Sequence, residues 1–358
     1  MEAYMEAYVD TLPVIVAVDG SPDSERALRW AVQEARLRSA ALHVVHVRPY
    51  GNAARATVAE EGGSPEPPGT PSTGDQVLDD LRRRFGTVAG AEDLPETEFR
   101  SLNGTADAAL PALGDEAQLL VLGSRGRGGF ASLLLGSNGL ACAAHSASPV
   151  VVVPRPDRAR VDRAAGGPAS ADLDDRPGGR ADATGERGAA GEARASAAGR
   201  GARVEGAPCE VALGVDAMSD EPAAIGFAFE EASRRGARLK VVSGYTWPLL
   251  APPAFEFSAV YEGTQQEYEN ALSAQLDEAL APHRARHPEV RVDVTLNDTD
   301  AAGQLVEASG GCDLVVVARH RRRLPLGRRL GSVAHAVLLH ALCPIAVVPE
   351  GGRGRSGE

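Results

Sequence analysis

Three glycines and a serine in the first half of the chain are spaced as in a loop that binds an anion. Directly after an apolar run at residues 119–122, the pattern is Gly123-x2-Gly126-x9-Gly136-Ser137, and its last two residues open a helical pattern. Glycines let backbone N–H groups approach an anion without a Cβ in the way. A helix N-terminus adds unpaired donors and the positive end of the helix dipole. The pattern therefore predicts a phosphate site.

The surrounding residues distinguish this loop from other phosphate and catalytic motifs. No lysine follows the last glycine, as it would in a Walker A loop, and the only lysine of the chain is Lys240. The glycines also do not follow the first strand, as a dinucleotide-binding fingerprint would. The sequence holds no nucleophile elbow, no H-E-x-x-H and no base with an evident orienting partner. These residues predict ligand binding without catalysis.

The elements that must position this loop alternate between strand and helix. Continuous apolar strands separated by amphipathic helices are typical of a parallel sheet covered on both faces. Such sheets bind ligands at the carboxyl ends of their strands, where Asp19 would join the glycine loop. Asp19 could otherwise start the next helix, for which Ser24 is the expected N-cap. The predicted strands are residues 14–18, 42–47, 98–102, 119–122 and 150–153, and the predicted helices are residues 24–38, 76–85, 106–113 and 136–145.

The same succession of apolar runs occurs twice. Order and spacing are preserved at an offset of about 195 residues, as tandem duplication of one domain produces. The sequence therefore predicts an α/β protein of two tandem doubly wound domains, each with a five-stranded parallel sheet, at residues 10–154 and 209–350. The matched runs are PVIVAVDG at 13–20 and EVALGVDA at 210–217, QLLVLG at 118–123 and DLVVVA at 313–318, and SPVVVVP at 148–154 and CPIAVVP at 343–349.

Two segments have a composition that cannot build a core. Residues 155–208 consist mainly of Gly, Ala, Arg, Asp and Ser, so burial of apolar area cannot offset their ordering entropy. We expect this segment to be a disordered linker. Residues 50–74 have a similar composition and are expected to form a mobile loop within the first domain.

Overall composition excludes several classes of protein. Of the 358 residues, 43% are hydrophobic and 24% are charged, as in globular proteins, and the net charge is −12. An acidic chain opposes binding to nucleic acid or to an anionic membrane. No run of 18 apolar residues occurs and the N-terminus is acidic, so we expect a cytoplasmic protein. The scattered cysteines, Cys142, Cys209, Cys312 and Cys343, predict buried thiols without disulfides or a structural metal.

Taken together, these motifs resemble the universal stress protein family, in particular its tandem two-domain, actinobacterial-type members. The resemblance is carried by VAVDGS at residues 16–21, by the glycine signature, and by the ending AAHSASPVVVVP at residues 143–154. It implies an adenine nucleotide alpha hydrolase-like sheet with strand order 3-2-1-4-5 and an ATP site in members that keep the signature. It also implies dimerisation through the last strand and a role in stress-linked regulation.

The resemblance also implies roles for individual residues. Asp19 and the backbone of Val47 would face the adenosine, while the glycines and Ser137 would hold the ribose and phosphates. Asn138 and Gly139 replace the Val-Ser that is usual after that serine. The full set of expected cofactor-binding residues is Ala17, Val18, Asp19, Val47, Gly123, Arg125, Gly126, Arg127, Gly136, Ser137 and Asn138.

The second half departs from the signature. Ala318 and Arg321 replace the first two glycines, and an arginine side chain would fill space that a phosphate needs. We expect this site to be degenerate for ATP. The alternative is an altered anion site built on Arg319, Arg321 and the pair Gly331-Ser332. The arginine-rich run at residues 319–329 is otherwise expected to be a solvated basic face.

The sequence as a whole favours a non-enzymatic, ATP-binding regulatory protein with ATP in the first domain, the need for Mg²⁺ being left open. One alternative is a structural module in which both domains serve dimerisation, and another is a weak ATPase. The apolar strands at residues 150–153 and 345–348 could pair edge to edge, in a homodimer or in an intramolecular pseudo-dimer. No nucleic acid or membrane partner is expected, and the sequence identifies no protein partner.

Overall fold

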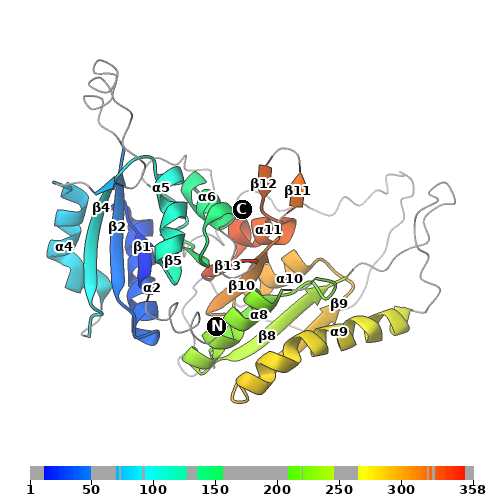
Figure 1. Ribbon diagram of the computed structural model, residues 1–358. Coiled ribbons are helices and arrows are strands. Elements are labelled where there is room, and N and C mark those ends of the chain that lie inside the picture. The colour runs from blue at the N-terminus through cyan, green and yellow to red at the C-terminus, as the bar shows by residue number, and fades with distance from the viewer. Residues whose placement is uncertain are drawn as a thin grey trace, which may run out of the picture.

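The computed structural model describes residues 12–49, 74–90, 93–126, 135–155, 209–219, 221–245, 265–320 and 330–350, and the backbone of 70–71, 322–324 and 327–329. Within these residues, one continuous sheet of eleven strands runs through both halves of the chain (Figure 1). Its strand order is β3-β4-β2-β1-β5-β6-β13-β10-β7-β8-β9. The predicted α/β fold class is confirmed.

The first half forms five parallel strands in the order 3-2-1-4-5, as expected. A short sixth strand, β3, pairs antiparallel with β4 at the sheet edge, inside the segment that was expected to be a mobile loop. Apart from Gly74, the remainder of that segment lies outside the described residues. The elements are β1 (Val14–Ala17), α2 (Pro22–Leu37), β2 (Leu42–Arg48), β3 (Thr70–Pro71), α4 (Gln76–Ala89), β4 (Thr97–Asn103), α5 (Ala106–Ala112), the 3-10 helix η1 (Leu113–Glu116), β5 (Leu119–Gly123), α6 (Ser137–His145) and β6 (Val150–Val153).

The second half repeats this order with its own five parallel strands. A separate two-stranded hairpin, β11 and β12, follows β10 in the region that was expected to be a basic face. The elements are β7 (Glu210–Gly214), α8 (Pro222–Arg235), β8 (Arg238–Gly244), α9 (Gln265–Arg286), β9 (Val292–Asn297), α10 (Ala301–Ala308), β10 (Leu314–Arg319), β11 (Arg322–Leu324), β12 (Gly327–Arg329), α11 (Ser332–His340) and β13 (Ile345–Pro349).

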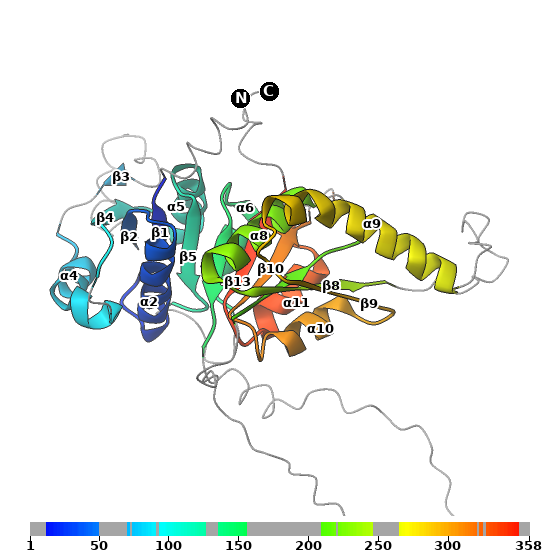
Figure 2. The same ribbon diagram turned by 90° about the horizontal axis from the view of Figure 1, so that it is seen from below.

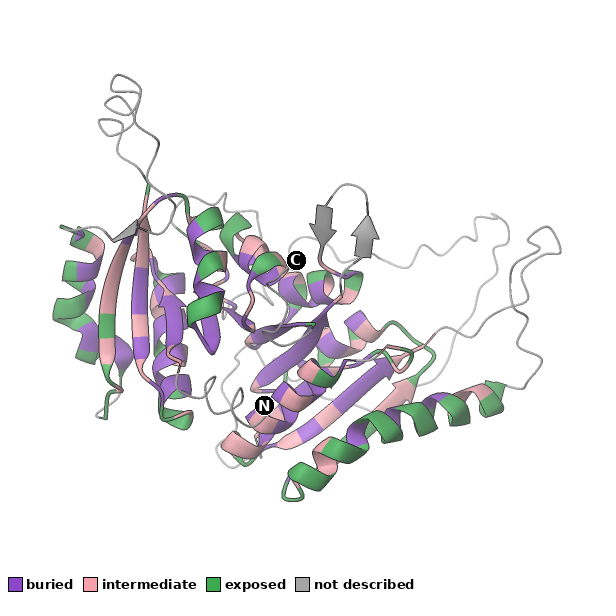
Figure 3. Cartoon of the chain, in the orientation of Figure 1, coloured by how far each residue is buried: buried purple, intermediate pink, exposed green. Residues whose placement is uncertain are grey.

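Helices cover both faces of the sheet. Helices α2, α4, α8 and α9 bury their apolar sides on one face, and α5, α6, α10 and α11 bury theirs on the other. Because both faces are covered, the central strands are mostly apolar, and all six residues of β10 are buried, including Arg319 at its end. Figure 3 shows buried residues concentrated in these strands, whereas the outer sides of α4 and α9 are exposed.

Helix α2 begins earlier than the sequence pattern predicted. Its N-cap is Ser21, whose Oγ accepts a hydrogen bond from the backbone N–H of Ser24 at 3.2 Å. Ser24, expected to be the cap, instead lies in the first turn and donates its own hydroxyl to the Ser21 carbonyl at 2.9 Å. Pro22 occupies the first helical position, where its missing N–H costs nothing. The prediction of Ser24 as the cap was therefore wrong, because Pro22 starts the helix.

Strands β6 and β13 join the two halves. They pair antiparallel, with Val150 opposite Val347 and Val152 opposite Ile345. Figure 2 shows β13 between β5 and β10, so neither half exposes its last strand. Since an unpaired apolar strand would be a template for aggregation, each half removes the exposed edge of the other. The chain thus forms the intramolecular pseudo-dimer that was one of the two pairings expected.

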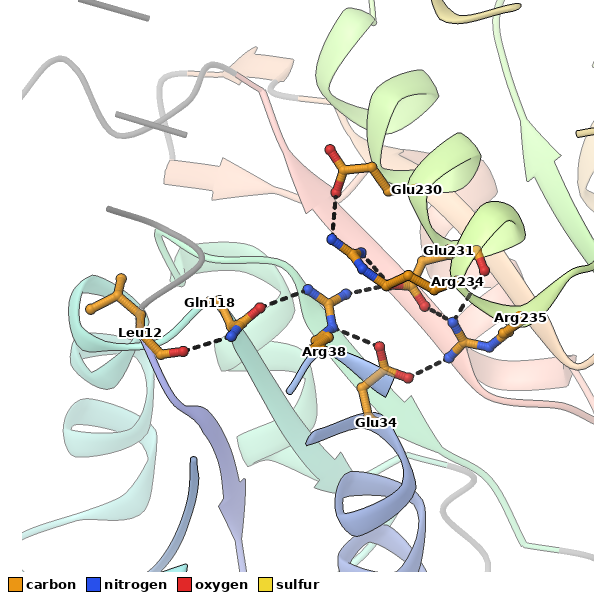
Figure 4. Close-up of polar contacts among 8 residues, drawn as sticks. All are labelled: Leu12, Glu34, Arg38, Gln118, Glu230, Glu231, Arg234 and Arg235. Carbon is orange, nitrogen blue, oxygen red and sulfur yellow. Dashed lines mark hydrogen bonds and ion pairs between the residues drawn. The ribbon is translucent and has the colours of Figure 1, made fainter. Parts of the chain in front are cut away.

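A ring of four charged residues joins α2 to α8 beside this strand pair (Figure 4). Arg38 contacts Glu34 of its own helix at 2.6 Å and also contacts Glu231 of the other half. Arg235 makes the equivalent contacts, to Glu231 and to Glu34. The four side chains are at most 10% exposed. Each guanidinium therefore bridges both carboxylates, and the ring closes only when both helices are present.

The repeat places equivalent residues on both sides of the ring. Arg38 lies over the ring of Phe227, with its Cζ 5.6 Å from the ring centroid, and Arg235 lies over Trp30 at 5.8 Å. Such cation–π contacts add stability when the cation is desolvated. The interface is thus two-fold symmetric in its contacts, although its two sides belong to one chain.

Arg319 was expected to lie on a solvated basic face or in an altered anion site, and it lies in neither. Its residue is 5% exposed, and its Nη1 donates a hydrogen bond to the Ser146 carbonyl at 2.6 Å. Ser146 follows α6 in the other half, so this arginine contributes to the contact between the halves rather than to a solvated surface. Arg321 lies outside the described residues.

Three of the four cysteines are buried, as the sequence predicted, and the fourth is only partly buried. Cys142, Cys312 and Cys343 are buried free thiols, and Cys209 is half-buried. Burial raises the pKa of Cys142 to about 12, and burial together with the nearby Asp313 carboxylate raises the pKa of Cys343 to about 12. Because reactivity needs the thiolate, the thiols of Cys142 and Cys343 are inert at neutral pH.

Breaking the ring should destabilise the whole chain. In Glu34→Gln, two buried guanidinium groups would share one carboxylate, so we expect the free energy of unfolding to fall by about 3 kcal/mol. Urea denaturation followed by circular dichroism measures this change. Glu98→Gln removes a carboxylate that is 60% exposed and should have almost no effect. Equal losses in the two variants would contradict the role of the ring.

Candidate functional site

A cavity of about 340 Å³ opens in the first half at the carboxyl ends of β1, β2 and β5. This is the edge at which doubly wound sheets bind ligands. One part of the lining is apolar, from the strand ends and α5, and the other part consists of the glycine loop and the start of α6. The lining residues are Ala17, Val18, Asp19, Ser24, Val45, His46, Val47, Ala106, Leu110, Leu122, Gly123, Arg125, Gly126, Leu135, Gly136, Ser137, Asn138 and Gly139.

Asp19 lies between β1 and α2 and contributes to both the turn and the cavity. Its Oδ1 accepts a hydrogen bond from the Ser21 N–H at 3.0 Å, which fixes the carboxylate. A Cβ placed on Gly126 would lie 2.7 Å from Asp19 Oδ2. Glycine at position 126 therefore lets the loop approach this carboxylate without displacing it.

The first turn of α2 packs against the beginning of the glycine loop. A Cβ on Gly123 would lie 2.7 Å from the backbone C and O of Asp23, so only glycine fits there. Asp23 is buried and pairs with Arg26 at 2.6 Å and with Arg155 at 2.9 Å. Its Oδ2 also accepts a bond from the Ser124 hydroxyl at 3.4 Å. This carboxylate therefore holds the beginning of the loop against α2.

The other end of the loop is the N-terminus of α6. Gly136 is its N-cap, with φ −78° and ψ 154°, a conformation that any residue can adopt. A Cβ on Gly136 would meet its nearest atom at 3.6 Å, so the packing of the protein itself does not require glycine here. Lacking a side chain, Gly136 gives the first amides of α6 no acceptor of the kind that Ser21 gives α2. These amides are suited to an anion.

The cavity brings together most of the residues expected from the sequence. Ala17, Val18, Asp19, Val47, Gly123, Arg125, Gly126, Gly136, Ser137 and Asn138 all line it, and Arg127 lies outside the described residues. Ser24, His46 and the apolar residues of α5 also line the cavity and were not among the residues expected from the sequence. Ser24 and the α5 residues could have been found from their place just beyond strand ends, whereas nothing local distinguishes His46 from other strand residues.

At the equivalent edge of the second half, neighbouring atoms lie close to the ends of two strands. A Cβ on Gly214, the counterpart of Ala17, would lie 2.5 Å from Leu305 Cδ1. A Cβ on Gly244, the counterpart of Val47, would lie 2.6 Å from the carbonyl oxygen of Thr299. A Cβ at either glycine would therefore displace Leu305 or the backbone at Thr299.

A charged pair also lies at this second edge. His320, at the position of Arg125, has its Nε2 2.6 Å from Oε1 of Glu221, which is 4% exposed. The hydrogen bond to Glu221 raises the pKa of His320, and this effect, with smaller contributions from the charges of Glu221, Glu350 and Asp216, outweighs the lowering by burial.

A larger groove, of about 800 Å³, lies elsewhere in the first half. It is lined by the end of α2 and by the segment that precedes β4, including Leu37, Ser39 and Leu94. This is the amino end of the strands, where doubly wound sheets do not place ligands. The smaller cavity is therefore the better candidate site.

Neither a metal cluster nor a membrane span is found in the described part of the chain. Among those residues, no group of three or more His, Cys, Asp or Glu side chains is arranged to hold a metal ion. No helix among them combines the length and the apolar character needed to cross a bilayer.

Comparison with known proteins identifies the family. The profile of the universal stress protein family matches residues 12–154 and 210–349, which are the two halves of the sheet. The chain belongs to the universal stress protein family. A universal stress protein of Mycobacterium tuberculosis is 29% identical over 342 residues, covering 94% of this chain and 97% of that protein. Another, from Mycolicibacterium smegmatis, is 28% identical over 351 residues, covering 94% and 96%.

Solved structures show the same tandem arrangement of the fold. The crystal structure of a universal stress protein from Archaeoglobus fulgidus aligns over 96% of this chain and 99% of its own, with a TM-score of 0.57. Its sequence identity is 12%, so the likeness concerns the fold alone. This universal stress protein therefore shares its arrangement of two halves with a relative of very different sequence.

The glycines of the loop should differ in their effect on stability. In Gly123→Ala the new methyl group would meet the backbone of α2, so we expect unfolding to become easier by about 1–3 kcal/mol. In Gly136→Ser the side chain has space and serine is a good N-cap, so stability should be unchanged or slightly higher. Thermal denaturation of the two variants measures this difference. Equal stability of both would show that the loop does not pack on α2 as described.

Proposed function

We propose that the first half of this universal stress protein binds ATP in the 340 Å³ cavity and acts as a non-catalytic regulatory module. The observation that carries the proposal is the uncapped N-terminus of α6 facing a glycine loop at the carboxyl edge of the sheet. That arrangement supplies backbone donors and a positive dipole end for phosphates.

The remainder of the cavity suits a nucleoside. Val45, Val47 and Leu110 offer an apolar surface for a base, and the Asp19 carboxylate can accept hydrogen bonds from ribose hydroxyls. The ionisable side chains of the lining are Asp19, His46 and Arg125. The adenosine therefore lies against β1 and β2, and the phosphates lie along the loop toward α6.

The second half has a different role in this proposal. Its carboxyl edge is filled by Leu305 and Thr299 and carries the His320–Glu221 pair, so it binds no ATP. Its contribution is the partner surface that completes the sheet and the charged ring. In this proposal the first half holds the one nucleotide site, and the second half has a structural role.

A substitution at the cap of α6 separates ligand binding from folding. In Gly136→Asp the carboxylate would cap the helix and stabilise its N-terminus, but it would repel the phosphates. The variant would lose a charge-assisted hydrogen bond to the phosphates, which contributes about 1.5–3 kcal/mol. We therefore expect the affinity for ATP to fall by about tenfold or more. Isothermal titration calorimetry with ATP measures the affinity.

The second half offers a matched control for this variant. Gly331 is the N-cap of α11 with a similar backbone, φ −58° and ψ 155°. Gly331→Asp should leave ATP affinity unchanged, because that edge is closed. Wild-type affinity in Gly136→Asp, or an equal loss in both variants, would contradict the proposed site.

The closed second edge also predicts the stoichiometry. Native mass spectrometry of the full chain with excess ATP should show one nucleotide bound per chain, lost in Gly136→Asp. Two nucleotides per chain would show that the second edge opens. Phosphate release by the wild type above the level of Gly136→Asp would replace the non-catalytic role with a slow ATPase.

A further inference from the structure

A buried carboxylate at the start of α8 is paired with a histidine from another part of the second half. Glu221 is the N-cap residue of α8, and its side chain is 2% exposed. Its Oε1 lies 2.6 Å from Nε2 of His320, the residue after β10. Among the described residues, Oε2 has no hydrogen-bond partner and no other cation lies within 4 Å of this carboxylate. The buried charge of Glu221 therefore depends on the charge of His320.

The pair with His320, rather than helix capping, keeps the Glu221 side chain in place. Glu221 accepts no hydrogen bond from the first amides of α8. Asp300, the N-cap of α10 in the same half, accepts hydrogen bonds from the N–H groups of Ala302 and Gly303. The Glu221 carboxylate can therefore leave its buried position without breaking a bond of its own helix.

His320 lies where three segments of the second half meet. Besides its contact with the start of α8, its Nδ1 lies 3.7 Å from Oε1 of Glu350, which follows β13. A Cβ on Gly331, the N-cap of α11, would lie 3.2 Å from the Cβ of His320. The His320 side chain is 36% exposed, so water can reach the imidazole that holds these segments together.

The charged groups that face His320 from the described elements are carboxylates: Glu221 of α8, Glu350 after β13 and Asp216 after β7. Arg319 precedes it in the chain and donates to the carbonyl of Ser146 in the other half. The side chains of the arginines that follow it, among residues 321–329, lie outside the described part of the chain. The hydrogen bond to Glu221 raises the pKa of His320 above its usual 6.5, although burial alone would lower it.

The first half uses arginine at the corresponding junction. Arg155, equivalent to Glu350 in the repeat, pairs at 2.9 Å with the buried Asp23 carboxylate of α2, which also pairs with Arg26 at 2.6 Å. A guanidinium keeps its charge throughout the pH range in which proteins fold, whereas an imidazole loses its charge near neutrality. Of the two junctions, the one that contains His320 is therefore the one whose cation titrates.

We propose that His320 is a pH-sensitive latch of the second half, which holds the start of α8 against β10 and β13 while the imidazole is charged and releases it when the imidazole loses its proton. In the neutral state, Glu221 keeps its charge at a position nearly out of water but has no cation beside it. Its side chain then turns toward solvent, and the first turn of α8 loosens. The latch lies outside the nucleotide cavity, so it is independent of the proposed function.

The direction of the pH effect follows from the raised pKa. Because the pKa of His320 is higher in the folded protein than in the unfolded chain, the pair contributes stability that is fully present below about pH 6.5. That stability is lost as the pH rises through the folded pKa. The latch is therefore closed in mildly acidic solution and opens in mildly alkaline solution.

Hydrogen exchange of the full chain, followed by mass spectrometry, tests the latch at the start of α8, residues 222–228. His320→Arg places a permanent charge where the first half has Arg125. At about pH 6, the wild type and His320→Arg should be equally protected there, and at about pH 8.5 the wild type should exchange several-fold faster. Comparing the two proteins at the same pH cancels the intrinsic effect of pH on exchange. The start of α2, which is held by arginines, should show no difference at either pH.

Two neutral variants keep the test valid if His320→Arg does not fold. With protection expressed relative to the unfolded chain, His320→Gln should be poorly protected at both pH values. Glu221→Gln has no buried charge and should be well protected at both. The wild type should then resemble Glu221→Gln at about pH 6 and His320→Gln at about pH 8.5.

The matched control is His335→Gln, which changes an exposed histidine of α11 and should behave as the wild type does. Equal protection of the wild type at both pH values would overturn the inference. A loss of protection at alkaline pH that persists in Glu221→Gln would overturn it as well, because the buried charge would then not be its cause.

Discussion

The buried ring of Glu34, Arg38, Glu231 and Arg235 is the constraint on which the arrangement of this molecule depends. Four charges out of water are unfavourable unless each carboxylate meets a guanidinium from both helices. Neither half can form the ring alone, because each supplies only one glutamate and one arginine. The ring therefore acts together with the β6–β13 pair: the strands supply backbone hydrogen bonds, and the ring fixes how α2 lies beside α8. A shifted strand register would leave the charges buried without their partners.

The candidate site depends on the same helix that carries half of the ring. Helix α2 begins at the cavity, where Ser21 caps it and Asp23 holds the glycine loop, and it ends at the ring with Glu34 and Arg38. The helix is thus anchored at both ends, so the shape of the loop follows from where the second half places α2. The packing of the second half on α2 thus helps to position the candidate site of the first half.

The sequence predicted the fold well, because repeated apolar runs separated by helices admit few topologies and the offset of the repeat identified two copies. The glycines of the cavity could also be predicted, because they lie close together in the sequence at a recognisable spacing. It did not predict the ring, since Glu34 with Arg38 and Glu231 with Arg235 look like ordinary surface pairs four residues apart on a helix, and their burial depends on which helices meet. Arg319 was misjudged for the same reason, because it lies in a run of arginines but its partner, Ser146, is in the other half. Glu221 and His320 are separated by a long segment of chain, so only the fold brings them together.

The antiparallel pairing of β6 with β13 turns the two half-sheets in opposite directions, so their carboxyl edges lie at opposite ends of the molecule. In a homodimer of identical domains, a mutation that closed one site would close both. When the two copies are joined in one chain this restriction is removed, because a substitution such as alanine for glycine at position 318 affects the site of one half only. One copy can then lose its ligand and keep its helices for pairing, while the other retains the glycines. Division of labour between a binding half and a supporting half is thus a consequence of joining two symmetric partners in one chain.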